Sequence, residues 1–214
     1  MSLRTFAATL VLTLSATGAQ LPELRIEATV GASIFHIKNV APLPLTAYLV
    51  ELVGYPGSSF TLVQDEITSE PIPGGGEKSL KVTDMTVGAA PEYVKVQAAL
   101  YADGSSGGAP EKVAQLVEHR RLILQTTREL IGRLEKAGSA GTPKATLLAD
   151  LKQWSGAMQP PTRRERSSPA GINQAAARRL IEDTAALLDA KSADEILTSL
   201  RASERSLASS KPAL

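Results

Sequence analysis

Apolar and polar residues alternate with a period of two along much of the first half of the chain. This pattern runs through 24–30, 34–38, 79–83 and 94–100. The period predicts β-strands with one face in a core and the other in water. The segment 45–53 is nearly all apolar, which is typical of a strand covered on both faces, and 60–63 is a shorter candidate.

Turn-forming residues separate these segments. Proline and glycine recur at Pro42, Pro44, 54–57, 71–76 and Pro91. Proline fixes φ and cannot donate to a ladder, and glycine allows positive φ. Six or seven short strands with this spacing predict an antiparallel β-sandwich or small barrel, and the lack of intervening helical patterns argues against parallel βαβ units.

From Pro110 onward the apolar period becomes helical. Apolar residues between 113 and 134 form one stripe, interrupted by Arg120 and Thr127, and we expect this helix to end near Lys136. A second helix starts at Thr142-Pro143 and ends at Gly156, and a third spans 173–191. Ser192 and Glu195 match a capping box, which predicts a fourth helix. The predicted fold class is therefore α+β: an N-terminal antiparallel β-sandwich followed by an all-α C-terminal region of about four helices.

The apolar stripes of these predicted helices must pack against another surface to be buried from water. One reading is that the helices pack on each other or on the sandwich; the other is that they form a groove for a partner or for a homo-oligomer.

The first 19 residues have the three-part order of a secretory signal. Arg4 precedes an uncharged apolar stretch at 6–14, and small residues follow up to Ala19. Cleavage after Ala19 fits this order, and cleavage after Gly18 fits almost as well. The stretch is too short to span a bilayer, so we expect a periplasmic or secreted protein with no transmembrane segment after signal removal.

These patterns divide the chain into successive units. We predict the following order: a signal peptide at 1–19, the sandwich at 20–103, a linker with two helices at 104–156, a flexible basic linker at 157–171, a helical hairpin at 172–208, and a fraying tail at 209–214.

The chain contains no cysteine, which excludes disulfides, thiol catalysis and thiolate metal sites. Charge is unevenly distributed: residues 20–103 carry five basic and ten acidic side chains, whereas residues 104–214 carry 17 and 12. The two halves could attract each other, or each could face its own partner. The net charge of +1 argues against nucleic-acid binding.

Several motifs invite a catalytic or ligand-binding reading. Residues 104–108 match G-x-S-x-G around Ser106, but a Gly/Ser linker explains the match because no hydrolase-like order of acid and histidine follows. His36 and His119 lack further ligands at metal-binding spacing. The glycines at 74–76 fit a turn, and the acidic residues of 65–70 fit a solvated loop without the spacing of an EF-hand. We therefore expect no catalytic residue, cofactor or metal.

Basic side chains offer the clearest candidates for contact with a partner. Arg120 and Arg121 are adjacent on the first helix, and Arg163, Arg164 and Arg166 lie in the proline-rich linker. These five arginines are candidate contacts with a partner. The arginines of 163–166 could also touch anionic lipid, wall polymer or nucleic acid, but three arginines with one glutamate form a weak patch.

Two passages of the β half resemble immunoglobulin-like or fibronectin III-like modules of bacterial exported proteins. Lys38-Asn39-Val40, followed by the step through Pro42 and Pro44 into 46–50, resembles the passage between their second and third strands, and 94–105 is similar to their last strand. The cysteine pair and strand-C tryptophan of antibody domains are missing.

The resemblance implies a sandwich fold and a role in binding or spacing. We therefore expect a non-catalytic exported protein that binds a protein partner in the envelope, forms a homo-oligomer or acts as a structural module. The alternative is a hydrolase of an unrecognised type.

Overall fold

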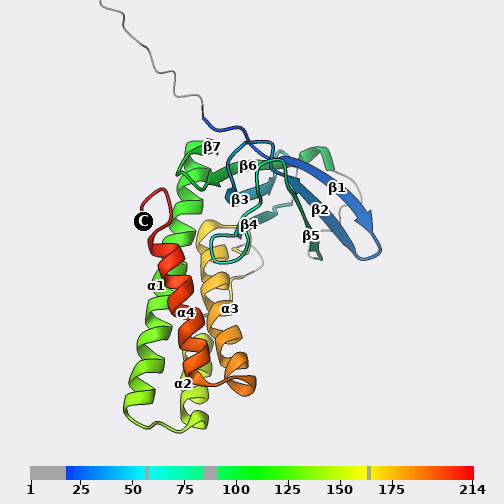
Figure 1. Cartoon of the computed structure of the whole chain (residues 1–214). Helices are drawn as coiled ribbons and strands as arrows, with labels where there is room; N and C mark the ends of the chain where they lie inside the picture. Colours follow the sequence, from blue (N-terminus) through cyan, green and yellow to red (C-terminus); the bar gives the residue numbers. More distant parts are fainter. Residues whose placement is uncertain (1–17, 56–57, 84–90, 163–164) are drawn as a thin grey trace, which may run out of the picture.

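The structure is a computed structural model that describes residues 18–55, 58–83, 91–162 and 165–214. The predicted signal, apart from Gly18 and Ala19, lies outside the described residues. Strands come first and helices follow (Figure 1), which confirms the α+β class and the order of the two parts.

The strands form two antiparallel sheets. One sheet has the order β1-β2-β5, from β1 (Glu23–Thr29), β2 (Ala32–Lys38) and β5 (Glu77–Val82). The other has the order β4-β3-β6-β7, from β3 (Leu45–Leu52), β4 (Thr61–Asp65), β6 (Val94–Tyr101) and β7 (Ser106–Gly108). A short 3₁₀ turn, η1 (Pro91–Tyr93), precedes β6.

The alternation of apolar residues places one face of each sheet in a shared core. Phe35 and Ile37 of β2 belong to the same buried cluster as Tyr48 and Val50 of β3. The intervening residues of β3, Ala47 and Leu49, face the opposite way and join a second cluster. The central strand β3 is therefore covered on both faces, as its continuous apolar run predicted.

The side chain of Asn39 stabilises the connection between β2 and β3. Its amide nitrogen donates to the carbonyls of Leu43, at 2.8 Å, and Ile72, at 2.9 Å, and its side-chain oxygen accepts from the backbone N–H of Ala41. A buried amide with these partners replaces ladder bonds that the chain loses where it leaves the sheet.

Four helices follow: α1 (Pro110–Ser139), α2 (Lys144–Ala157), α3 (Pro169–Ala190) and α4 (Ala193–Ala208). The number of helices agrees with the prediction, and both hydrogen bonds of the capping box at Ser192 and Glu195 are present. The start of α3 differs from the prediction, because Ser168 caps it and Pro169 occupies the first turn, where proline is tolerated.

The helix α1 contacts both halves of the molecule. Its first turns pack on the four-stranded sheet, where Leu116 joins Ala47, Leu49, Ala98 and Leu100. Its remainder runs beside the other helices (Figure 1), and one buried cluster draws leucines and isoleucines from all four helices. The chain therefore covers its own helical stripe, as the first of the two readings expected.

Two sequence predictions need correction in the β half. Residues 106–108 were assigned to a linker, but they form β7, which pairs with 98–100 of β6. Ala28 and Val30 were placed on a core face, but both are exposed, and Val30 has a relative exposure of 104%. Ala28 lies on an edge strand and is exposed although Ser33, directly opposite it on β2, is buried, and Val30 lies in the turn between the two strands.

Candidate functional site

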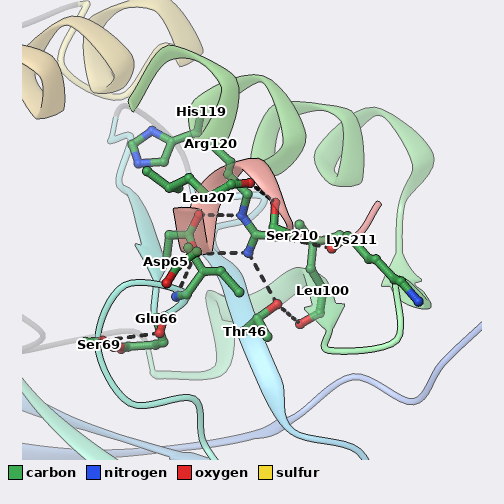
Figure 2. A network of polar contacts seen from close by, with 12 residues as sticks. Thr46, Asp65, Glu66, Ser69, Leu100, His119, Arg120, Leu207, Ser210 and Lys211 are labelled. Atoms are coloured by element: carbon green, nitrogen blue, oxygen red, sulfur yellow. Dashed lines mark hydrogen bonds and ion pairs between the residues drawn. The ribbon is translucent and has the colours of Figure 1, made fainter. Parts of the chain in front are cut away.

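The most prominent polar cluster lies where α1 meets the four-stranded sheet (Figure 2). Arg120 of α1 has a relative exposure of 0%. Its Nε donates to Asp65 Oδ2 at 2.7 Å, and its Nη2 donates to Asp65 Oδ1 at 2.9 Å. This two-pronged contact matches the planar guanidinium to the planar carboxylate and joins α1 to the end of β4.

Further acceptors surround the same guanidinium. Nη2 also donates to Thr46 Oγ1 at 3.3 Å, and Nη1 donates to the carbonyl of Lys211 at 3.1 Å. Thr46 in turn donates to the carbonyl of Leu100 at 3.1 Å. The network thus ties together α1, both central strands of the sheet and the segment after α4.

The position of Arg120 follows from helical geometry. It lies four residues after Leu116 and four before Leu124, and both leucines are buried. It therefore belongs to the buried stripe instead of interrupting it. Thr127 is also buried in the stripe and donates to the carbonyl of Ile123 at 2.8 Å.

The segment after α4, which we expected to fray, contacts the rest of the chain in the structure. Ser210 is buried, and its hydroxyl donates to the carbonyl of Leu207 at 2.6 Å. The carbonyl of Lys211 accepts from Arg120. This segment is held because it covers a buried charge, and that requirement cannot be read from its Ser/Lys/Pro composition.

Of the acidic residues expected in a solvated loop, Asp65 is the last residue of β4 and Glu66 is buried. Asp65 pairs with Arg120, and Glu66 is buried and accepts from Ser69 Oγ and Lys78 Nζ, both at 2.6 Å. Burial, and secondarily the charge of Glu66, raises the pKa of Tyr48 above its ordinary value of 10.0. Glu70, the third acidic residue of 65–70, is exposed.

The two histidines occupy different settings. His119 is buried, and its Nδ1 lies 2.8 Å from Asn173 Oδ1, so it joins α1 to α3. His36 lies on the outer face of the three-stranded sheet. Ser79 Oγ is 2.9 Å from His36 Nδ1, and Glu27 Oε2 is 3.4 Å from His36 Nε2. A serine, a histidine and a glutamate thus stand in a row across three strands, an arrangement that sequence spacing did not suggest.

Ser106, the other serine considered as a nucleophile, lies in the antiparallel strand β7 and not at a strand-to-helix elbow. Its carbonyl accepts from the N–H of Ala19 at 2.9 Å. The glycines around it serve close packing: a Cβ at Gly107 would lie 2.2 Å from the carbonyl oxygen of Ala19.

The five arginines predicted to contact a partner are not gathered on one surface. The Arg120 guanidinium is hydrogen-bonded within the chain, and the side chain is fully buried, so a partner cannot reach it in this conformation. Arg121 is exposed and pairs with Glu118 at 2.6 Å, and Arg166 is exposed before α3. Arg163 and Arg164 lie outside the described residues.

Over the part of the chain that the structure describes, no group of three or more histidine and acidic side chains is arranged to hold a metal ion. An open groove of about 420 Å³ runs between α1 and α4 and is lined by Ile131, Glu135, Thr198, Arg201, Glu204 and Arg205. Arg201 pairs with Glu135, and Glu204 pairs with Arg128, so ion pairs also hold these two helices together.

None of the helices within 18–55, 58–83, 91–162 and 165–214 has the length and apolar character needed to cross a membrane. Comparison with known proteins gave no match to a family model, to a curated protein or to a solved structure.

Proposed function

We propose that the chain is a non-catalytic exported protein that acts as a protein-binding or structural module of the cell envelope. The observation that carries this proposal is the network around Arg120. Its guanidinium is bonded to Asp65, Thr46 and Lys211 within the chain. This buried network thus holds sheet and helices together, as a rigid scaffold requires.

The strand order supports a β-sandwich of the immunoglobulin-like or fibronectin III-like kind. In such modules the first, second and fifth strands share one sheet, as β1, β2 and β5 do here. The last two strands lie beside the third in the other sheet, as β6 and β7 lie beside β3. The buried cluster shared by both sheets fits this assignment.

Export is supported by the three-part order of residues 1–19. Cleavage after Gly18 would leave Ala19 in place to donate to the Ser106 carbonyl, whereas cleavage after Ala19 would remove that donor.

We place the partner contact on the helical part, whose residues from 104 to 214 carry an excess of five positive charges. Arg121 and Arg166 are the exposed members of the predicted set. An acidic surface on the partner would complement them, mainly by raising the rate and specificity of association.

Site-specific crosslinking tests this proposal. Removing residues 110–214 would uncover the cluster around Leu116, so single photoreactive residues are preferable to deletion. We expect a tagged protein with such a residue at Arg121 or Arg166 to be recovered outside the cytoplasm, shortened by 18 or 19 residues. We also expect it to be joined to one reproducible envelope protein.

The matched control carries the same photoreactive residue at Lys95, which is exposed on β6. Equal recovery of the envelope protein from the control position would place the contact elsewhere. An uncleaved protein that stays in the cytoplasm would refute export, and absence of any joined envelope protein at Arg121 and Arg166 would refute the binding role.

A second candidate is a hydrolase, and the row formed by Ser79, His36 and Glu27 is the observation in its favour. The row lies on an open sheet face, whereas a nucleophilic serine also needs oxyanion donors beside it. If this candidate is right, a fluorophosphonate probe will label the protein, and Ser79→Ala will abolish labelling while Ser106→Ala retains it. Without labelling, Ser79 is not an activated nucleophile.

A further inference from the structure

Among the described residues, β1 is an edge strand of the three-stranded sheet. Asn39 N donates to the carbonyl of Gly76 at 2.8 Å, so the backbone of Asn39 points toward β5. Backbone direction alternates along a strand, and even-numbered residues of β2 therefore point toward β1. Since Arg25 faces His36 and Glu27 faces Ile34, the backbone groups of Leu24, Ile26 and Ala28 point outward, away from β2.

The edges of the other sheet are partly occupied. Ala19 donates to Ser106 of β7, and the Thr61 hydroxyl of β4 donates to the carbonyl of Ser167 at 3.2 Å. On the remaining edge strand, β5, the inward-facing Lys78 is bound to the buried Glu66. Within the described residues, the outward backbone groups of β1 make no hydrogen bond to another segment.

β1 also leaves apolar surface uncovered. Leu24 and Ile26 are partly buried against the core shared by both sheets, whereas Ala28 is exposed and Val30 is fully exposed at the hairpin turn. An unpaired edge strand that continues the core face with apolar residues is a template for an added strand.

The sequence of β1 is self-complementary in one antiparallel register. If Ile26 faces Ile26 of a second copy, the whole strand pairs, and Leu24 faces Ala28 of that copy. Arg25 of each copy then faces Glu27 of the other, so the two-fold symmetry gives two pairs of opposite charge. The register also allows backbone hydrogen bonds. Leu24, Ile26 and Ala28, whose N–H and C=O groups point outward, each face one of these three residues in the second copy.

The neighbouring registers are unfavourable. Moving the second copy by two residues in one direction places Arg25 opposite Arg25, and moving it in the other places Glu27 opposite Glu27. Like charges directly opposite one another destabilise strand pairing. Arg25 and Glu27 lie on the outer face with side-chain exposures of 65% and 54%, which leaves both accessible to a second copy. Within their own strand Arg25 Nη1 lies 4.0 Å from Glu27 Oε2, so cross-strand pairing would compete with this exposed contact.

We propose that β1 pairs antiparallel with β1 of a second copy of this chain, with Ile26 at the two-fold axis, so that two three-stranded sheets become one continuous six-stranded sheet. The surface uses none of the helical residues assigned to an envelope partner, so this proposal does not depend on export or on that partner.

Charge reversal tests both the surface and the register. The protein, expressed from its full sequence, is studied by sedimentation velocity over about a hundredfold range of concentrations. We expect a concentration-dependent dimer. Arg25→Glu and Glu27→Arg should each weaken self-association by about tenfold or more, because each opposes two pairs of like charges. An equimolar mixture of the two variants should associate, since every facing pair is then of opposite sign.

The double variant R25E/E27R restores opposite charges within one chain and should dimerise again. Circular dichroism checks that each variant is folded. Ala28→Pro provides an independent test, because it removes an outward N–H that no described segment of the chain uses, and it should weaken the dimer. A wild-type protein that stays monomeric throughout would overturn the proposal, as would single variants that dimerise like the wild type or a mixture that does not associate.

Discussion

Arg120→Ala is expected to destabilise the protein by about 3–5 kcal/mol, the range for removing one partner of a buried ion pair. The change leaves the Asp65 carboxylate without its two charge-assisted bonds and leaves the Lys211 carbonyl and Thr46 hydroxyl without a donor. The free energy of unfolding from urea titration measures the effect.

Two control variants show whether this loss of stability comes from the buried ion pair. Arg121→Ala, at the neighbouring exposed position, should change stability by less than about 0.5 kcal/mol. The double variant R120M/D65L should lose less than Arg120→Ala alone, because apolar groups of similar size replace the whole pair. If Arg120→Ala were as mild as Arg121→Ala, the network would not contribute to folding in solution.

Gly108→Ala is expected to lower the free energy of unfolding by more than about 2 kcal/mol, because it introduces both a strained φ and a steric clash. Gly108 has a φ of +99°, in the region that side chains disfavour. A Cβ there would also lie 2.0 Å from the carbonyl oxygen of Gln97, so either β7 or β6 must move. Urea titration gives the loss of stability, and amide exchange at 97–99 reports whether β7 has separated from β6.

Gly132→Ala is the matched control, since a Cβ at Gly132 meets nothing within 4 Å. Gly132 lies in the interior of α1, and replacing glycine with alanine in a helix gains up to about 1 kcal/mol. A Gly108→Ala variant as stable as the wild type would mean that β7 is not paired as described. It would also reopen the linker reading of residues 104–108.

Local patterns predicted most of the elements and missed those set by distant contacts. The alternation at 34–38 and the apolar run at 45–53 correspond to β2 and β3, because burial against a core imposes those periods. The strand β7 was missed because Ser106, Gly107 and Gly108 carry no apolar signal, and their structure depends on pairing with β6. The exposure of Val30 likewise depends on where the core ends, which its own segment does not encode.

The same reasoning explains the outcome for the candidate site. Arg120 was singled out, but as an exposed contact, because a charge in an apolar stripe is usually an interruption. Its spacing of four residues from Leu116 and from Leu124 was the available signal for burial. Its partners, Asp65 and Lys211, lie 55 and 91 residues away in sequence, and nothing in the helix itself indicates them. The row of Glu27, His36 and Ser79 could not be predicted either, because its residues come from three separate strands.

The 91-residue separation between Arg120 and Lys211 also has a consequence for biogenesis. A growing polypeptide presents Arg120 and Asp65 to one another long before α3, α4 and the Lys211 carbonyl have left the ribosome. Until then the guanidinium lacks one of its acceptors and the helical cluster lacks the residues of α3 and α4, so the nascent chain can reach its final packing only after synthesis has passed α4. If the chain is exported as we propose, this late closure would help to keep it unfolded until it has crossed the membrane.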